Sequence, residues 1–376
     1  MRNNNTIGLI FSNMHDEVLR DTTAMRAMGS VPFGGRYRLI DFALSNLVNA
    51  GIPKVGVVTK RNYQSLMDHL GSGKSWDLSR KNQGLYFLPP VNTNDDMYNG
   101  RIASLAEIHP FLRNSKEEYV VMTDCYVVGN IDLDAIIEEH VASGAEITIA
   151  YKKGQAPGLA GELVLQVDAD RRVRDILLRG GQMSTRRTSD DCCYGIGLYV
   201  LRKDLLMRLV DMCVAHNQHH FERDILQRQV DSLQLYGYEV PELTLEISSP
   251  ASYFEANMAL LDQAIRDQLF LPHRPVYTKV RDCPPALYGL HAQVSHSLVA
   301  DGCKIDGTVT NSIIFRDVQI GREAHLENCI VMQGTKVGGR SSLSYVVMDK
   351  NVQIQEGRML QGFSSYPIFI AKEATV

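Results

Sequence analysis

The feature that most constrains the fold is a short repeat toward the C-terminal end of the chain. From about Leu290 to Gly357, apolar residues recur at steps of roughly six residues, with glycines between them. The apolar positions are Val299, Ile305, Ile314, Ile320, Leu326, Val337 and Leu343. A repeat this short buries its apolar side chains only by stacking on its neighbours, which is the arrangement of a parallel β-helix. The run has room for only about four coils, so it predicts a small β-helical domain.

The preceding part of the chain has a different pattern, in which short β-rich runs alternate with stretches of helical periodicity from Thr6 to about Phe270. Expected strands include 7–11, 54–59, 119–124, 147–151 and 195–201, and expected helices include 39–48, 63–70, 101–112, 133–142 and 203–215. This alternation predicts βαβ units and a mostly parallel sheet. The arginine-rich stretch 158–191 lacks it and is expected to be irregular. We therefore predict an α/β domain over 1–270, a linker over 271–289 and a β-helix domain over 290–376.

Composition and charge favour an ordinary globular protein and argue against two classes of partner. The 376 residues carry a formal net charge of −4, which gives no electrostatic reason to expect nucleic acid or a membrane surface as a partner. No apolar stretch in the sequence approaches the roughly 20 residues needed to span a bilayer. The seven cysteines are scattered and form no C-x-x-C pair, so we expect reduced thiols and a cytoplasmic location.

The most distinctive string of the chain runs from Val31 to Phe42 and reads VPFGGRYRLIDF. It resembles the second half of the signature of ADP-glucose pyrophosphorylases (glucose-1-phosphate adenylyltransferases), K-P-A-V-P-F-G-G-[KR]-[YF]-R-[IL]-I-D-F. The first half, a G-G-x-G-[ST]-R-L loop, falls on the stretch from Asn13 to Leu19, where only Leu19 is kept. An intact scaffold with an erased nucleotide loop is similar to the regulatory, GlgD-type subunits of the bacterial enzyme. The resemblance covers nearly the whole chain and implies a Rossmann-like nucleotidyltransferase domain followed by a short left-handed parallel β-helix.

The degenerate nucleotide loop has lost the residue types that hold a triphosphate. The glycines of the family fall on Asn13, Met14 and Asp16, its arginine on Val18, and the lysine of K-P-A-V on Met28. Side chains now replace the glycines that let backbone N–H groups approach phosphates, and two positive charges are missing. Asp16 and its neighbour Glu17 add negative charge that repels phosphate. We therefore expect this loop not to bind ATP; a loop of different geometry that still binds ATP is the alternative.

Two carboxylates fall where the family binds its metal ion. Asp124 ends the strand expected at 119–124 and aligns with the aspartate of the family's G-D-H, and Glu246 aligns with the aspartate of W-[RK]-D-V-G-T. The resemblance implies that these positions bind Mg²⁺, which demands near-ideal octahedral geometry that the longer side chain of Glu246 can misplace. An alternative of equal weight is that Asp124 only caps the following loop. We treat both residues as vestigial and expect no functional catalytic residue in this chain.

Three other motifs of the family are eroded. Arg179 keeps the cation of E-E-K-P and is the candidate for binding a sugar phosphate. Arg101 replaces the threonine of G-T-A-D-A at the start of an expected helix, where we expect a solvated surface charge, with an anion-binding group as the alternative. The histidines His216, His219 and His220 are expected to form a solvated surface in preference to a metal site.

The resemblance implies a non-catalytic or weakly catalytic subunit of glycogen biosynthesis. It would assemble with a catalytic ADP-glucose pyrophosphorylase paralogue as a heterotetramer and raise the activity of that partner. The assembled enzyme would use Mg²⁺ to convert ATP and glucose-1-phosphate to ADP-glucose and diphosphate, and a small-molecule effector is a further expected ligand.

Two other functions compete with this interpretation. The first is an independent nucleotidyltransferase in which Asp124 and Glu246 bind Mg²⁺ and Arg179 binds the sugar phosphate. The second is a hexapeptide acyltransferase, which ranks last because the coils are few and His325 is the only histidine well inside them.

Overall fold

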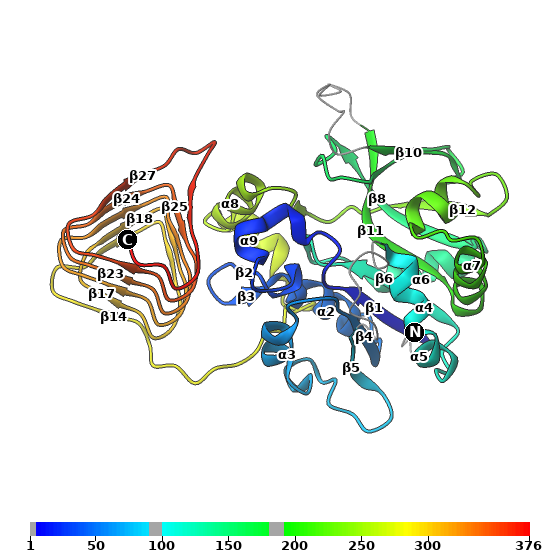
Figure 1. Cartoon of the computed structure of the whole chain (residues 1–376), viewed down its shortest axis with the longest axis horizontal. Coiled ribbons are helices and arrows are strands. Elements are labelled where there is room, and N and C mark those ends of the chain that lie inside the picture. Colours follow the sequence, from blue (N-terminus) through cyan, green and yellow to red (C-terminus); the bar gives the residue numbers. More distant parts are fainter. Residues whose placement is uncertain (1–4, 90–99, 180–191) are drawn as a thin grey trace.

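The computed structural model describes residues 5–89, 100–179 and 192–376, which form an α/β domain followed by a three-sided parallel β-helix (Figure 1). The fold class expected from the sequence is confirmed. The two parts are joined by the segment between α9 (Gln263–Leu269) and β14 (Leu287–Tyr288). Within the described ranges, none of the helices combines the length and the apolar character that a membrane crossing requires.

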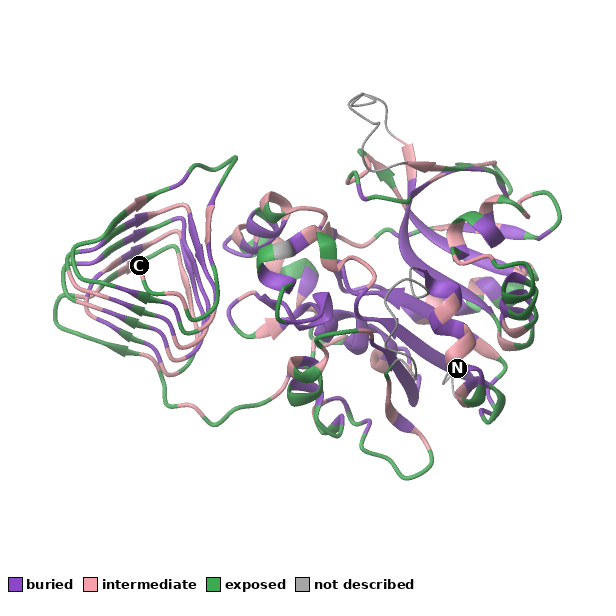
Figure 2. Ribbon diagram, viewed as in Figure 1, coloured by how far each residue is buried: buried purple, intermediate pink, exposed green. Residues whose placement is uncertain are grey.

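A nine-stranded sheet forms the centre of the α/β domain, with β1 (Thr6–Phe11) inside it. β1 pairs in parallel with β4 (Lys54–Val58) on one side and with β6 (Tyr119–Asp124) on the other, and β5 (Gly84–Leu88) continues this parallel half. Every residue of β1 is buried (Figure 2). Its apolar side chains alternate between two apolar clusters on the two faces of the sheet.

The other half of the sheet is built around the long strand β11 (Cys192–Arg202). β11 runs antiparallel to β6, to β8 (Ile147–Gly154) and to β9 (Glu162–Val167). β10 (Val173–Arg179) pairs with β9, and β12 (Leu235–Glu239) pairs in parallel with β8. The sheet is therefore parallel around β1 and antiparallel around β11, and the carboxyl end of β6 lies at the junction of the two halves.

The remaining elements of this domain are short strand pairs and helices that cover the sheet. The strand pairs are β2 (Pro32–Phe33) with β3 (Tyr37–Arg38) and β7 (Val127–Gly129) with β13 (Thr244–Glu246). The helices and helical turns are η1 (Asp16–Leu19), α1 (Arg20–Thr23), η2 (Met28–Ser30), α2 (Leu39–Asn49), α3 (Gln64–Leu70), η3 (Lys74–Trp76), α4 (Arg101–Glu107), α5 (His109–Arg113), α6 (Leu133–Ser143), α7 (Lys203–Ala215), η5 (Phe221–Gln227), α8 (Pro250–Ala259) and α9.

The β-helix consists of three parallel sheets of five short strands each. The first sheet contains β14, β17 (Lys304–Ile305), β20 (Gln319–Ile320), β23 (Lys336–Val337) and β26 (Gln353–Ile354). The second contains β15 (Gln293–Ser295), β18 (Thr308–Thr310), β21 (His325–Glu327), β24 (Ser342–Ser344) and β27 (Met359–Gln361). The third contains β16 (Leu298–Val299), β19 (Ile313–Ile314), β22 (Ile330–Val331), β25 (Val346–Met348) and β28 (Ile368–Ile370).

Three local expectations are wrong. The single helix expected over 101–112 is two helices, α4 and α5, because Pro110 stands in the first turn of α5, where it supports a new start and cannot continue α4. The stretch expected to be irregular forms β9 and β10 over its described part, 158–179, while 180–191 lie outside the described residues. The β-helix has five strands on each face, one more than the coils expected.

The third sheet of the β-helix packs against the α/β domain. Its residues Ile313, Ile330 and Val347 belong to the same apolar cluster as Phe33 of β2 and Leu260, which follows α8. The two parts of the chain therefore share one continuous core.

Candidate functional site

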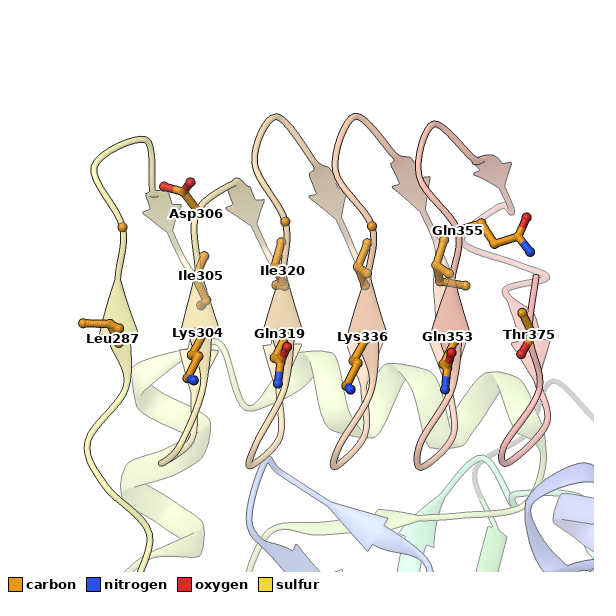
Figure 3. A pocket seen from close by; sticks show the side chains of 15 residues that line it. Leu287, Lys304, Ile305, Asp306, Gln319, Ile320, Lys336, Gln353, Gln355 and Thr375 are labelled. Atoms are coloured by element: carbon orange, nitrogen blue, oxygen red, sulfur yellow. The ribbon is translucent and has the colours of Figure 1, made fainter.

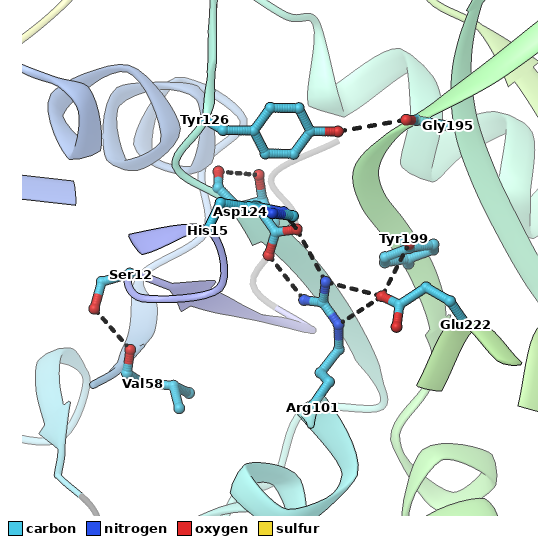
Figure 4. Close-up of polar contacts among 10 residues, drawn as sticks. Ser12, His15, Val58, Arg101, Asp124, Tyr126, Gly195, Tyr199 and Glu222 are labelled. Atoms are coloured by element: carbon cyan, nitrogen blue, oxygen red, sulfur yellow. Dashed lines mark hydrogen bonds and ion pairs between the residues drawn. The ribbon is translucent and has the colours of Figure 1, made fainter. Parts of the chain in front are cut away.

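A cavity of about 140 Å³ lies at the carboxyl end of β6, where charged side chains converge (Figure 4). The loop after β1, the start of α4, and residues of β6, β9, β11 and η5 form its walls. The polar side chains that line it are those of His15, Arg101, Asp124, Tyr126, Glu162, Tyr199, His220 and Glu222. Because ligands of open α/β sheets bind outside the carboxyl ends of the strands, this cavity is the candidate site.

Asp124 makes a two-pronged ion pair with Arg101 in this cavity. Nη1 of Arg101 donates to Oδ1 of Asp124 and Nη2 donates to Oδ2, both at 2.9 Å. Both side chains are buried, with 2% of each exposed. Burial alone would raise the pKa of Asp124, but the attraction to Arg101 and the hydrogen bonds from His15 and Arg101 hold that pKa below its ordinary value. Asp124 is therefore ionised, and both of its oxygens face a guanidinium group.

Arg101 has a second carboxylate partner and lies over two aromatic rings. Its Nε and Nη2 atoms contact Oε1 of Glu222 at 3.1 and 3.0 Å. Its guanidinium carbon lies 4.4 Å from the ring centroid of Phe11 and 5.4 Å from that of Tyr199. Burial disfavours the charged form of Arg101, but the carboxylates outweigh this effect and raise its pKa. The expectation of a solvated surface charge at Arg101 is wrong, because this arginine is an interior residue.

The backbone of β11 approaches Asp124 closely at Gly197. This residue has a φ of +70°, and a Cβ atom built there would lie 2.6 Å from Oδ2 of Asp124. Glycine is the residue that tolerates both the left-handed conformation and the missing space. Nε2 of His15 also lies 3.5 Å from Oδ2 of Asp124, and the His15 ring packs edge-on against Tyr126. The carboxylate of Asp124 is thus enclosed by the protein.

The degenerate nucleotide loop is folded onto its own side chains. The carboxylate of Asp16 accepts from the side-chain amide of Asn13 at 2.6 Å and from the backbone N–H of Met28 at 2.7 Å. Burial raises the pKa of Asp16 to about 6, although these two donors counteract it. The carboxylate of Asp16 therefore accepts the hydrogen bonds that these two donors can make.

The other substituted positions of the loop serve packing. Met28 is 1% exposed and belongs to an apolar core cluster, and Val18 packs against the same cluster. Met14 packs against the second cluster and lines the cavity beside His15. Only Met14 of these three side chains reaches the candidate site.

Glu246 and Arg179 lie apart from the Arg101–Asp124 pair. Glu246 ends β13, and its Oε1 accepts from the hydroxyl of Thr244 at 2.7 Å and from that of Tyr194 at 3.5 Å. Arg179 ends β10 and lies 3.9 Å from the carboxylate of Glu162. Glu162 lines the cavity, whereas neither Glu246 nor Arg179 is among the described residues that line it.

The donor set around Asp124 does not suit Mg²⁺. This ion requires close to six oxygen ligands at about 2.1 Å, whereas the oxygens of Asp124 face a guanidinium group and Glu246 bonds elsewhere. Over residues 5–89, 100–179 and 192–376, no three His, Cys, Asp or Glu side chains converge in a way that could bind a metal ion. His219 and His220 instead donate their backbone N–H groups to Asp224.

Sequence reasoning missed the pairing of Arg101 with Glu222, which lie 121 residues apart in the chain. The signal was present, because both positions gain a charge where the family motifs G-T-A-D-A and H-D-F-G-K-D have an uncharged residue. Two opposite charges gained together point to a contact between them. His15 was missed because it falls on the unspecified position of the G-G-x-G loop, and Glu162 because it lies outside the motifs compared.

A second hollow of about 510 Å³ lies along the first sheet of the β-helix, far along the chain from Asp124 (Figure 3). Lysine and glutamine alternate on successive strands, so Lys304 and Lys336 are separated by Gln319. This regular surface does not bring together groups that could carry out a reaction, and His325 of the neighbouring sheet is exposed.

The sequence matches two family models and several characterised proteins. The model described as nucleotidyl transferase matches 17–263, and the model described as GlmU-like, C-terminal hexapeptide matches 287–362. The chain is 32% identical to the glycogen biosynthesis protein GlgD of Bacillus subtilis (strain 168), over 99% of this chain and 97% of that protein. It is 36% identical to GlgD of Geobacillus stearothermophilus, over 86% and 83%. A glucose-1-phosphate adenylyltransferase of Geobacillus stearothermophilus is 28% identical, over 85% and 82%.

Proposed function

Because this chain belongs to the GlgD glycogen biosynthesis proteins within the nucleotidyl transferase family, we propose that it acts in glycogen biosynthesis as a modulatory subunit of glucose-1-phosphate adenylyltransferase. It assembles with a catalytic paralogue, as a heterotetramer, and raises the activity of that partner. The partner binds Mg²⁺ and converts ATP and glucose-1-phosphate to ADP-glucose and diphosphate. Scattered free cysteines are consistent with a cytoplasmic complex.

The observation that carries this proposal is the ion pair between Arg101 and Asp124. Charge stabilisation by metal ions and cationic groups is the main contribution of a protein to phosphoryl and nucleotidyl transfer. Here the carboxylate at the family's metal position is neutralised by an arginine of the same chain. Asp16 likewise accepts hydrogen bonds from Asn13 and Met28, at the loop that holds phosphates in active relatives. Both arrangements favour a subunit without chemistry of its own.

The existence of a catalytic partner is supported by the relatives. Geobacillus stearothermophilus has both a GlgD protein and a glucose-1-phosphate adenylyltransferase, and this chain is similar to each over most of its length. A docked subunit raises the activity of its partner when it binds the competent state of that partner more tightly than other states.

The proposal extends to an anionic small-molecule effector. A crevice between the α/β domain and the β-helix is lined by five cationic residues, Arg36, Arg38, Arg281, Arg316 and Lys350. Burial, together with the neighbouring arginines, lowers the pKa of Lys350 to about 7. An anion in this crevice would relieve the repulsion among these groups. Its effect is tested by adding inorganic phosphate to the mixed enzyme and comparing the wild-type chain with Lys350→Met.

The central experiment measures ADP-glucose formation with Mg²⁺ by this chain alone, by the catalytic paralogue alone and by the two together. We expect no turnover by this chain, and a higher rate or affinity in the mixture than with the paralogue alone. A second mixture contains a paralogue whose metal-binding aspartate is replaced by alanine, and it should be inactive because all chemistry belongs to that subunit. Turnover by this chain alone, or by the second mixture, would overturn the proposal. Native mass spectrometry of the mixture reports the subunit ratio.

A further inference from the structure

The candidate site contains a buried arginine that faces two carboxylates. We infer that Arg101 supplies, from within the chain, the positive charge that a divalent ion brings to Asp124 in metal-dependent relatives. The site has exchanged a diffusible cation for a covalently attached one. This inference concerns the chain by itself and stands whether or not the chain raises the activity of a partner.

The geometry of the contacts supports this exchange. The two nitrogens of Arg101 that face Asp124 engage one carboxylate oxygen each, so both oxygens that would ligate a metal ion are used. The same guanidinium group also reaches Glu222, so it joins two carboxylates as a bridging ion would. A planar guanidinium fork matches carboxylate geometry and is less strongly hydrated than a lysine ammonium group, which suits a buried position.

The burial of the group distinguishes it from an accidental surface contact. Arg101 is 2% exposed, with Phe11 and Tyr199 beside its guanidinium group. Its position at the start of α4 ties that helix to β6 through Asp124 and to η5 through Glu222. A metal ion shared by the same carboxylates would make the same three-way connection.

The inference predicts what happens when the arginine is removed. Arg101→Thr, which restores the residue of the family motif, leaves Asp124 and Glu222 without their shared cation and with His15 nearby. Both carboxylates contact Nη2 of Arg101, and two carboxylates completed by water are a suitable ligand set for a small divalent ion, for which Mn²⁺ is the probe. We expect the variant to bind about one Mn²⁺ per chain, with an affinity at least ~10-fold higher than that of any Mn²⁺ binding by the wild type elsewhere on its surface. The wild type should bind none at this site.

Binding is measured on the full-length chain with Mn²⁺ alone, from the loss of the free-ion electron paramagnetic resonance signal. Arg101→Lys keeps a cation and should behave as the wild type. Adding Asp124→Asn to Arg101→Thr should abolish the new site. Arg274→Thr is the matched control, because Arg274 also contacts two carboxylates, Asp132 at 2.9 Å and Glu242 at 3.4 Å. Asp132 is 45% exposed, so water can replace the lost cation there and no such site should form.

Several results would overturn the inference. One is Mn²⁺ binding by the wild type that Asp124→Asn abolishes. Another is an Arg101→Thr chain that folds and binds no Mn²⁺, and a third is equal binding by Arg274→Thr. If Arg101→Thr unfolds in metal-free buffer, circular dichroism with Mn²⁺ decides: recovery of the native spectrum supports the inference, and a spectrum that stays unfolded overturns it.

Discussion

Arg26 in the α/β domain and Asp349 in the β-helix form a buried ion pair although they lie 323 residues apart in the sequence. Nη2 of Arg26 donates to Oδ2 of Asp349 at 3.0 Å, and Nη1 lies 2.9 Å from Oδ1. Both side chains are almost completely buried. The two domains are therefore joined by a shared apolar core and by a buried charged contact.

Breaking this contact should destabilise the whole chain. Asp349→Asn leaves the charge of Arg26 buried without its counter-ion, and the loss of one member of a buried pair costs roughly 3–5 kcal/mol. The measurement is urea unfolding, in which we also expect the β-helix and the α/β domain to begin unfolding separately. Glu356→Gln is the control, since it breaks the exposed pair with Arg340 and should cost no more than about 1 kcal/mol. Equal losses in the two variants would contradict this prediction.

Asp16 should impose a pH dependence on stability. Its pKa is raised to about 6 in the folded chain from an ordinary value of 3.8, so between these values the folded state binds the extra proton. Stability contributed by this group is therefore present at low pH and is lost as the pH rises from about 4 to about 6. Asp16→Asn keeps an acceptor oxygen and removes the titration. Its stability relative to the wild type should rise by roughly 1–3 kcal/mol across this interval, and parallel urea-unfolding profiles would contradict the assignment.

Gly197→Ala should cost more than its backbone conformation alone explains. The new Cβ would lie 2.6 Å from Oδ2 of Asp124 and 3.0 Å from a ring carbon of Tyr126. We expect a loss of roughly 2–4 kcal/mol in urea unfolding, from strain at positive φ together with the clash. Gly144→Ala is the matched control, because Gly144 has a φ of +65° with nothing within 4 Å of the added Cβ, and should cost only about 1 kcal/mol. If Gly197→Ala loses no more unfolding free energy than Gly144→Ala, the residues around Gly197 move to accommodate the added Cβ, and the prediction is contradicted.

Restoring the lysine of the family at Met28 should damage the fold without restoring activity. Met28 is 1% exposed in an apolar cluster, so Met28→Lys buries an ammonium group and should cost more than about 3 kcal/mol. Met28→Leu preserves the volume and should cost less than about 1.5 kcal/mol. Urea unfolding measures both, and the ADP-glucose assay of each variant alone should stay at background. A stable and active Met28→Lys chain would contradict the view that Met28 serves packing and that the loop no longer binds ATP.

The sequence allowed the architecture to be predicted because its periodic signals are strong. The buried strands β1 and β6 and the helix α2 appear where apolar runs and helical spacing indicated them. β10 was missed because its pairing with β9 shifts register between Val173 and Asp175, which breaks the alternation that marks a strand. The first strand of the β-helix, β14, fell in the expected linker because Leu287 and Tyr288, both exposed, do not continue the apolar repeat.

The candidate site was only partly predictable, for a physical reason. Asp124 was placed correctly at the carboxyl end of a buried strand, since local pattern determines strand ends. Its neighbours were not, because Arg101 contacts Asp124 and Glu222 contacts Arg101 from elements distant in the sequence, and a single sequence does not specify long-range contacts. The burial of Arg101 depends on that three-way contact, so no local pattern could distinguish it from a surface arginine.

Asp16 and Arg101 give the chain a property that ligand-dependent subunits lack. A bound ligand stabilises a folded protein in proportion to the logarithm of its concentration, so the stability of such subunits follows supply. Here the balancing charges are part of the polypeptide, and their effective concentration is constant. We expect the melting temperature of this chain to be indifferent to ATP and Mg²⁺, so that the number of subunits ready to assemble depends on how many chains are synthesised and not on the metabolic state around them.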